Sequence, residues 1–81
     1  MESVRNIRLF LKVLQAGSFS AAGRQSGLSP AAVSRSISML ESDLQAQLLY
    51  RTSRKLTLTE VGKTVAASAR VIIDKMDELE A

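Results

Sequence analysis

The 81-residue sequence contains no cysteine, no histidine and no tryptophan, and only one proline. Without cysteine there is no disulfide framework. Without cysteine and histidine, the commonest catalytic base, the thiolate nucleophile and the usual transition-metal ligands are all missing. The sequence also lacks a glycine-rich dinucleotide fingerprint and a phosphate-binding loop. We therefore expect no enzyme activity, no metal site and no cofactor.

Long apolar runs are absent as well. No stretch reaches the roughly 18 apolar residues that a membrane span needs, and the first ten residues, MESVRNIRLF, lack the layout of a signal peptide. Hydrophobic residues make up 46% of the chain and aromatic residues 4%, which is typical of a globular chain rather than a disordered one. We expect one small cytoplasmic domain with a thin core and no contact with membranes.

Acidic residues are scarce in the first three quarters of the chain. Residues 1–59 carry eight basic side chains and three acidic ones, whereas residues 60–81 carry three basic and five acidic ones. The net charge of +3 therefore combines a basic body with a mildly acidic C-terminal segment. A basic body is typical of proteins that bind polyanions, although an ordinary surface with unevenly spread charge explains the same counts.

Three helices are predicted before residue 45. Residues 4–16 form the first, with two apolar strips: a core stripe of Ile7, Phe10, Leu11 and Leu14, and a second strip of Leu9, Val13 and Ala16 that needs another packing partner. A short helix over 20–26 follows a serine cap and ends at Gly27. Ser29 before Pro30 is a strong start signal for a third helix, 30–44.

Two short strands and a long helix complete the chain. QLLYR (47–51) and KLTLT (55–59) alternate apolar and polar residues, which predicts a hairpin. Thr59 can cap a helix over 60–80, about 30 Å long at 1.5 Å per residue. Its apolar residues follow spacings close to those of a coiled-coil seam, namely Val61, Val65, Ala69, Ile72, Met76 and Leu79.

These parts are typical of a mainly α, winged helix-turn-helix fold with an appended helix. The predicted third helix buries Val33, Ile37, Leu40 and Leu44. Its opposite side carries small residues and one cation: Ala31, Arg35, Ser38 and Ser42. A face that is small, polar and free of negative charge suits the major groove of DNA, where serine, alanine and arginine can contact base edges. The other interpretation is a face that is merely solvated.

Basic residues also gather at the expected hairpin tip, residues 51–55, which carries three cations and two hydroxyls. In a winged fold this tip reaches the sugar-phosphate backbone or the minor groove. Taken alone, the run fits a solvated charge cluster better. A second hypothesis covers the whole chain: a small helical module for dimerisation or protein interaction, whose basic charge is incidental. Binding to duplex DNA that weakens steeply with salt separates the two hypotheses.

The sequence resembles the DNA-binding domain of LysR-type transcriptional regulators along essentially its whole length. The resemblance rests on LFLKVLQAGSFSAA (9–22), LSPAAVSRSISMLE (28–41) and LLYRTSRKLTLTEVG (48–62). It implies a winged helix-turn-helix domain over 1–59, with the motif at 18–37 and the wing at 47–59, and a linker and dimerisation helix over 60–81. It also implies that a C-terminal effector-binding domain, absent from these residues, would take any small-molecule effector.

The resemblance also assigns positions to DNA contact: Pro30, Ala31, Ala32, Ser34, Arg35 and, on the wing, Arg54. Together with the residue patterns, it gives a candidate DNA-contacting set of Ser29, Pro30, Ala31, Ala32, Ser34, Arg35, Ser38, Arg51, Thr52, Arg54 and Lys55. Many members of the family carry Gln-Pro where this chain has Pro30-Ala31, so their base preference does not transfer. Ser26 also departs, standing where they usually have a core leucine, and Gln45 replaces a common glycine.

The seam of the last helix predicts a homodimer. It exceeds what one small body can cover, and the second strip of the first helix lacks a partner within a three-helix core. We expect two chains to pair through Leu9, Val13, Val61, Val65, Ala69, Ile72, Met76 and Leu79. The LysR resemblance implies the same arrangement, in which two recognition helices, 30–44, read an interrupted palindrome in double-stranded DNA.

Overall fold

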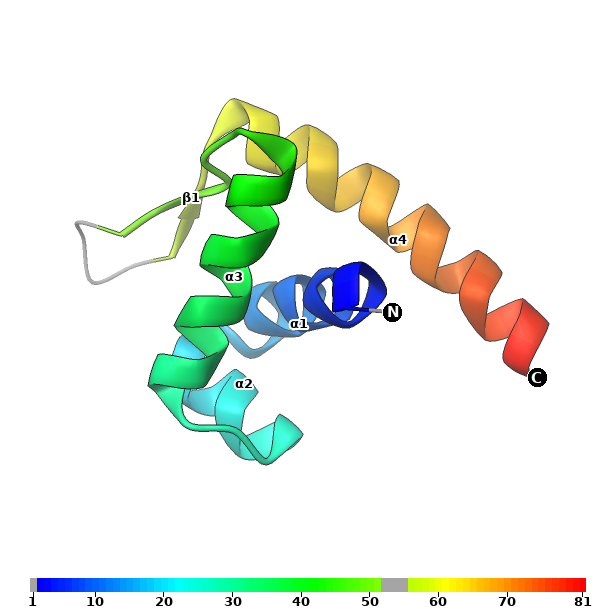
Figure 1. Ribbon diagram of the computed structural model, residues 1–81, viewed down its shortest axis with the longest axis horizontal. Helices are drawn as coiled ribbons and strands as arrows, with labels where there is room; N and C mark the ends of the chain where they lie inside the picture. Colours follow the sequence, from blue (N-terminus) through cyan, green and yellow to red (C-terminus); the bar gives the residue numbers. More distant parts are fainter. Residues whose placement is uncertain (1, 52–55) are drawn as a thin grey trace.

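The computed structural model describes residues 2–51 and 56–81, which form four helices and a two-stranded sheet (Figure 1). The elements in chain order are α1 (Glu2–Ala16), α2 (Phe19–Ser26), α3 (Pro30–Leu44), β1 (Leu49–Tyr50), β2 (Thr57–Leu58) and α4 (Glu60–Glu80). Helices α1, α2 and α3 pack together as a body, the hairpin projects from one side, and α4 extends beyond the other (Figure 1). The predicted mainly α, winged helix-turn-helix fold is confirmed.

The turn between α2 and α3 follows from local sequence. The hydroxyl of Ser18 caps α2 by accepting the Ala21 N–H at 3.0 Å. Gly27 ends the helix at φ 71°, a left-handed conformation that glycine adopts without steric cost. Ser29 then caps α3 by accepting the Ala32 N–H at 3.1 Å, and Pro30 occupies the first turn as predicted. These caps fix where the turn begins and ends.

The backbone at the end of α3 is strained. Gln45 is left-handed at φ 53° and ψ 43°, and its N–H bonds back to the carbonyls of Glu41 and Ser42. Left-handed backbone costs a residue with a Cβ about 1–2 kcal/mol. The backbone is therefore strained at Gln45, between the end of α3 and the start of the wing.

Helix α1 is the centre of the core, and here one expectation was wrong. Leu9 is 6% exposed and Val13 fully buried, so these residues pack inside the single chain and have no free side to offer a second copy. Ile7 and Leu14, expected in the main stripe, are only partly buried. The reason is that α1 contacts α2, α3 and α4 of its own chain, which cover Leu9 and Val13 without a partner. Leu11, also expected in the main stripe, is partly buried and lies outside the core cluster.

The hairpin is shorter than predicted within the described residues. β1 and β2 are antiparallel, with Leu49 opposite Leu58 and Tyr50 opposite Thr57. Thr59 follows at once and joins the sheet to α4: its N–H donates to the Leu48 carbonyl at 3.0 Å, and its hydroxyl accepts the Gly62 N–H at 2.8 Å. A Cβ at position 62 would lie 2.1 Å from the Leu48 carbonyl oxygen, so glycine permits this close approach.

Helix α4 lies along α1 and then leaves the body (Figure 1). Gly62, Ala66 and Ala69 are its buried residues: Gly62 lies against Leu48 and Leu58 of the wing, and Ala66 belongs to the hydrophobic core. Near its end, Asp77 and Glu80 lie 2.9 and 3.3 Å from the guanidinium of Arg8 on α1. No helix among the described residues is long and apolar enough to cross a membrane.

Candidate nucleic-acid interface

One side of α3 is exposed and carries no acidic residue. Val33, Ile37 and Leu40 are buried against the body, while Ala31, Arg35, Ser38 and Ser42 are exposed, as the helical period predicts. Leu44 was expected in the buried stripe but is 46% exposed, because it is the last residue of α3. Arg35 is the only cation in the helix. We call the four exposed residues the α3 stripe. Apart from Arg35, its side chains are small, so the surface of DNA can come close to the helix backbone.

Met39 also belongs to this side and was missed. It is 40% exposed and stands four residues after Arg35, one turn further along the helix. Apolar residues at helical spacing are more often core than surface, which is why the sequence did not single it out. The helical periodicity nevertheless predicted its exposure, because it places Met39 on the side of α3 away from the buried residues.

The other candidate residues near the start of α3 differ in exposure. Ser29, Pro30 and Ala31 are exposed, whereas Ala32 and Ser34 are half-buried. The Ser29 hydroxyl is already used as the helix cap. Pro30 lacks a backbone N–H, so this end of α3 offers fewer donors to a phosphate than an ordinary helix start.

Arg51 is tied to the body on three sides. Its Nη1 donates to the Ser34 hydroxyl at 2.8 Å, and its Nη2 lies 3.1 Å from the Glu41 carboxylate. The guanidinium carbon also sits 5.4 Å from the centre of the Phe19 ring, within cation–π distance. The sequence predicted a contact between Arg51 and DNA. That contact stays a prediction; in the structure the guanidinium contacts Phe19 of α2 and Ser34 and Glu41 of α3.

Glu41 is the residue that sequence reasoning missed altogether. Its Oε2 accepts the N–H groups of Leu48 and Leu49 at 2.7 and 3.3 Å, while Oε1 faces Arg51. Glu41 thus bonds the start of the wing to α3. One weak signal existed, since Ser34 and Glu41 are seven residues apart and therefore share a side of the helix.

The remaining wing candidates, Thr52, Arg54 and Lys55, lie outside the described residues.

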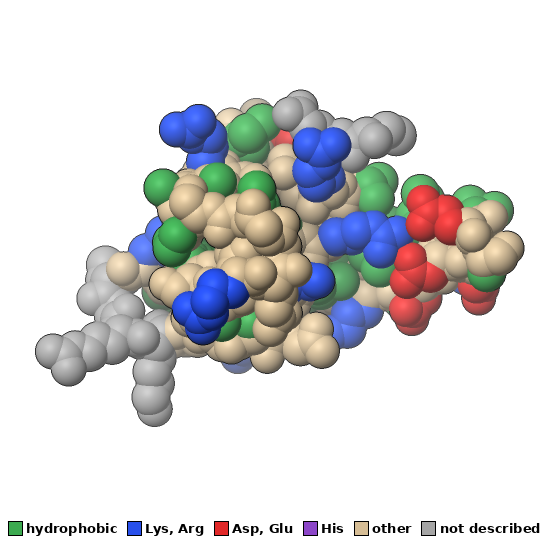
Figure 2. All heavy atoms as spheres, turned by 90° about the horizontal axis from the view of Figure 1, so that it is seen from below, with side chains coloured by type: hydrophobic (Ala, Val, Ile, Leu, Met, Phe, Trp, Pro, Cys, Tyr) green, Lys and Arg blue, Asp and Glu red, His purple; other side chains and the backbone are tan. Residues whose placement is uncertain are grey.

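Basic and acidic side chains gather in different parts of the molecule. Figure 2 shows lysine and arginine side chains over the three-helix body and acidic side chains gathered toward the end of α4. The division agrees with the eight basic and three acidic residues of positions 1–59.

The candidate dimer residues of α4 fall into two groups. Ala69 is 2% exposed and Val65 packs against the core, so both face the body of their own chain. Met76 is half-buried beside Val4 and Arg8. Val61, Ile72 and Leu79 are 49%, 44% and 81% exposed, and they form an apolar strip that nothing in the described chain covers.

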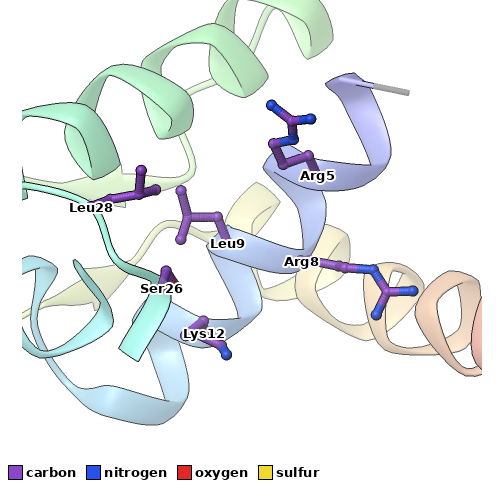
Figure 3. A pocket seen from close by; sticks show the side chains of 6 residues that line it. All are labelled: Arg5, Arg8, Leu9, Lys12, Ser26 and Leu28. Carbon is purple, nitrogen blue, oxygen red and sulfur yellow. The ribbon is translucent and has the colours of Figure 1, made fainter. Parts of the chain in front are cut away.

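An open hollow of about 410 Å³ lies on the other side of the body, between α1 and the turn before α3. Leu9, Ser26 and Leu28 come together over it, while the guanidinium of Arg8 points away toward α4 (Figure 3). Leu28 is 41% exposed there. The short side chain of Ser26 leaves this space unfilled.

Comparison with known proteins is consistent along the whole chain. The profile of the family described as bacterial regulatory helix-turn-helix protein, lysR family, matches residues 4–63. A probable transcriptional regulator of Klebsiella pneumoniae, LtrA, is 44% identical over 69 residues, covering 85% of this chain and 22% of that protein. The transcriptional activator AaeR of Escherichia coli K12 is 35% identical over 79 residues, covering 98% and 26%. The chain thus spans about a quarter of these relatives.

Solved structures agree with this assignment. The BenM_DBD/benA site 1 DNA complex superposes with a TM-score of 0.89 at 30% identity, covering 94% of this chain and 85% of that one. Vibrio fischeri DarR in complex with DNA gives a TM-score of 0.88 at 28% identity, covering 93% of this chain and 26% of that one. Both superpositions span α1 to α4 almost completely.

Proposed function

Because the chain belongs to the LysR family of bacterial regulatory helix-turn-helix proteins, we propose that it binds double-stranded DNA sequence-specifically through α3. The observation that carries the proposal is the α3 stripe, which is exposed, small and free of carboxylates, with Arg35 as its single cation. Such a face can enter the major groove, where an arginine pairs bidentately with guanine. Regulation of transcription, the role named for the relatives of which the chain spans about a quarter, is part of the same proposal.

The wing supports the second part of the proposal. Arg54 and Lys55 stand between β1 and β2 in the sequence, and we assign them to phosphates or to the minor groove. Arg51 stands apart from these two, because its guanidinium is held by Ser34, Glu41 and Phe19. Phosphate contacts position a protein on DNA, whereas base contacts supply its specificity.

We further propose that two chains pair through α4. The supporting observation is the exposed strip of Val61, Ile72 and Leu79. These residues are spaced by eleven and seven, so they return to one side of the helix. Pairing would present two α3 helices to the same side of the duplex, with half-sites one or two turns of ~10 bp apart. Leu9, Val13 and Ala69 are excluded from this interface because they are buried in one chain.

The test is a binding titration of the chain on a duplex that it selects from a random library, and on a scrambled duplex of the same length. Arg35→Ala should lower affinity for the selected duplex by about 1–3 kcal/mol and affect the scrambled duplex much less. Affinity should also fall steeply as salt rises. Arg70→Ala is the matched control, because it removes the same charge from an exposed position on α4.

Two results would contradict the proposal. Equal losses from Arg35→Ala on both duplexes would mean that Arg35 contacts only phosphate. No loss on either duplex would remove α3 from the interface. A chain that binds every duplex weakly and independently of salt would instead support the protein-interaction hypothesis.

A further inference from the structure

We propose that Arg51 is a positioning residue for DNA readout: it occupies the acceptor side of the Ser34 hydroxyl and so presents Ser34 to DNA as a hydrogen-bond donor. The inference rests on the proposed function and names a further reading residue within the same interface. Its partner chemistry is a hydrogen-bond acceptor in the major groove. Purine N7, guanine O6 and thymine O4 share that chemistry.

The direction of the hydrogen bond between these residues is fixed by chemistry. A guanidinium has five N–H donors and no acceptor, so the 2.8 Å contact from Arg51 Nη1 must end on an oxygen lone pair of Ser34. A serine hydroxyl has a single hydrogen. That hydrogen is therefore directed away from Arg51 and remains available for another partner.

The hydroxyl hydrogen has no other use among the described residues. A serine within a helix commonly donates to the carbonyl four residues earlier, as Thr64 does to Glu60 at 3.4 Å. For Ser34 that carbonyl belongs to Pro30, and no such bond occurs in the part of the chain that the structure describes. A charged donor on the oxygen also polarises the O–H group, which strengthens the bond it can donate.

The guanidinium is held firmly enough to fix this orientation. Glu41 accepts from Nη2 at 3.1 Å; its own side chain is only 17% exposed, whereas that of Arg51 stays on the surface at 29% exposure. The ring of Phe19 covers another side. Glu41 is itself held by two backbone N–H groups of the wing. The Ser34 hydroxyl, next to Arg35, thus receives its orientation from the base of the wing.

The experiment uses the whole chain, the duplex it selects from a random library, and a scrambled duplex. Ser34→Ala should weaken binding to the selected duplex about five-fold, the effect of one hydrogen bond, and leave the scrambled duplex unchanged. Arg51→Met should cause a loss of at least this size. In the double variant, Ser34→Ala should add less than about two-fold, because its hydroxyl no longer contributes. Ser38 lies on the same helix but does not contact Arg51. The fold losses of affinity caused by Ser38→Ala and Arg51→Met should therefore multiply in the double variant.

Modified duplexes identify the acceptor. Replacing each purine in turn by its 7-deaza analogue removes N7, replacing guanine by 2-aminopurine removes O6, and replacing thymine by 5-methylpyrimidin-2-one removes O4. One of these changes should weaken the wild-type chain about five-fold and leave Ser34→Ala unaffected. This comparison needs no change at Arg51, so it tests the donor role of Ser34 even if Arg51→Met fails to fold. If no modified duplex weakens the wild-type chain more than Ser34→Ala, Ser34 donates nothing to DNA and the inference is wrong.

The opposite results are equally clear. If the losses of Ser34→Ala and Arg51→Met multiply fully, the two residues act independently and the inference is wrong. It is also wrong if Arg51→Met weakens the scrambled duplex equally and lowers the salt slope by about one per monomer, because Arg51 would then contact phosphate directly. A wild-type chain that selects no sequence would overturn the proposed function itself.

Discussion

The carboxylate of Glu41 accepts the backbone N–H of Leu48 at 2.7 Å, and this bond joins the recognition helix to the first strand of the wing. Leu48 is fully buried, so its N–H has no water to bond in place of the carboxylate. The second N–H, that of Leu49, is satisfied by the same oxygen. One side chain therefore satisfies the polar backbone at the point where the chain leaves α3 and enters the sheet.

Replacing Glu41 by alanine should lower the free energy of unfolding by about 2–3 kcal/mol, because two buried N–H groups lose their acceptor. Urea denaturation monitored by circular dichroism measures this. Asp43→Ala is the matched control: it removes an exposed carboxylate from the same helix and should change stability by less than about 0.5 kcal/mol. Similar midpoints for the two variants would show that the Glu41 bonds are not needed for the fold.

Replacing Gln45 by glycine should raise the free energy of unfolding by about 1 kcal/mol. Its φ of 53° is strained for a residue with a Cβ and free of strain for glycine. The opposite sign is expected for Gln25→Gly inside α2, where glycine costs roughly 1 kcal/mol. Thermal unfolding of both variants makes the comparison. A loss of stability in Gln45→Gly would mean that the side chain matters more than the backbone.

Replacing Ser26 by leucine should stabilise the chain by about 1 kcal/mol. The added side chain reaches the hollow beside Leu9 and Leu28 and covers apolar surface there, at roughly 25 cal/mol per Å². Ser26→Ala adds no such contact and serves as the control. Denaturation midpoints measured at equal protein concentration decide the question. If the leucine variant is no more stable than the alanine variant, the space is not available to a side chain.

Replacing Ile72 by aspartate should separate the proposed dimer into monomers. An unpaired carboxylate in the middle of an apolar seam is costly to bury. Affinity for a duplex with two half-sites should fall steeply, because the second half-site no longer binds at high effective concentration. Binding to a single half-site should stay as weak as before. Sedimentation and binding titrations supply the measurements.

Ala67→Asp is the control for the seam, since it adds the same charge at an exposed position on another side of α4. It should leave both the mass in solution and the affinity unchanged. A wild-type chain that sediments as a monomer at high micromolar concentration, with no DNA bringing two copies together, would refute the pairing through α4.

Much of the fold could be predicted because local signals in this chain are strong. Ser29 with Pro30 fixes the start of α3, Gly27 fixes the end of α2, and Thr59 fixes the start of α4. Periodicity then separated the buried side of α3 from the α3 stripe. Each of these signals involves residues within one or two helical turns of each other, so it can be recognised in the sequence alone.

What the sequence did not reveal depends on contacts between distant segments. Periodicity marks Leu9 and Val13 as apolar but does not say whether α4 or a second chain covers α1. In the same way, a basic run at 51–55 does not distinguish an arginine that reaches outward from one that bonds Ser34 and Glu41, seventeen and ten positions away. Only the packed geometry assigns these partners.

Thr59 has a mechanical consequence. It ends the hairpin and caps α4 at once, with its hydroxyl donating to the Gln47 carbonyl at 2.6 Å and its N–H to Leu48. The joint between wing and α4 is therefore stiff, since no flexible residue separates β2 from the helix. A rotation of α4 that broke the contacts of Asp77 and Glu80 with Arg8 would therefore also act on the base of the wing. Rotation of α4 and tilt of the wing are then one movement and not two.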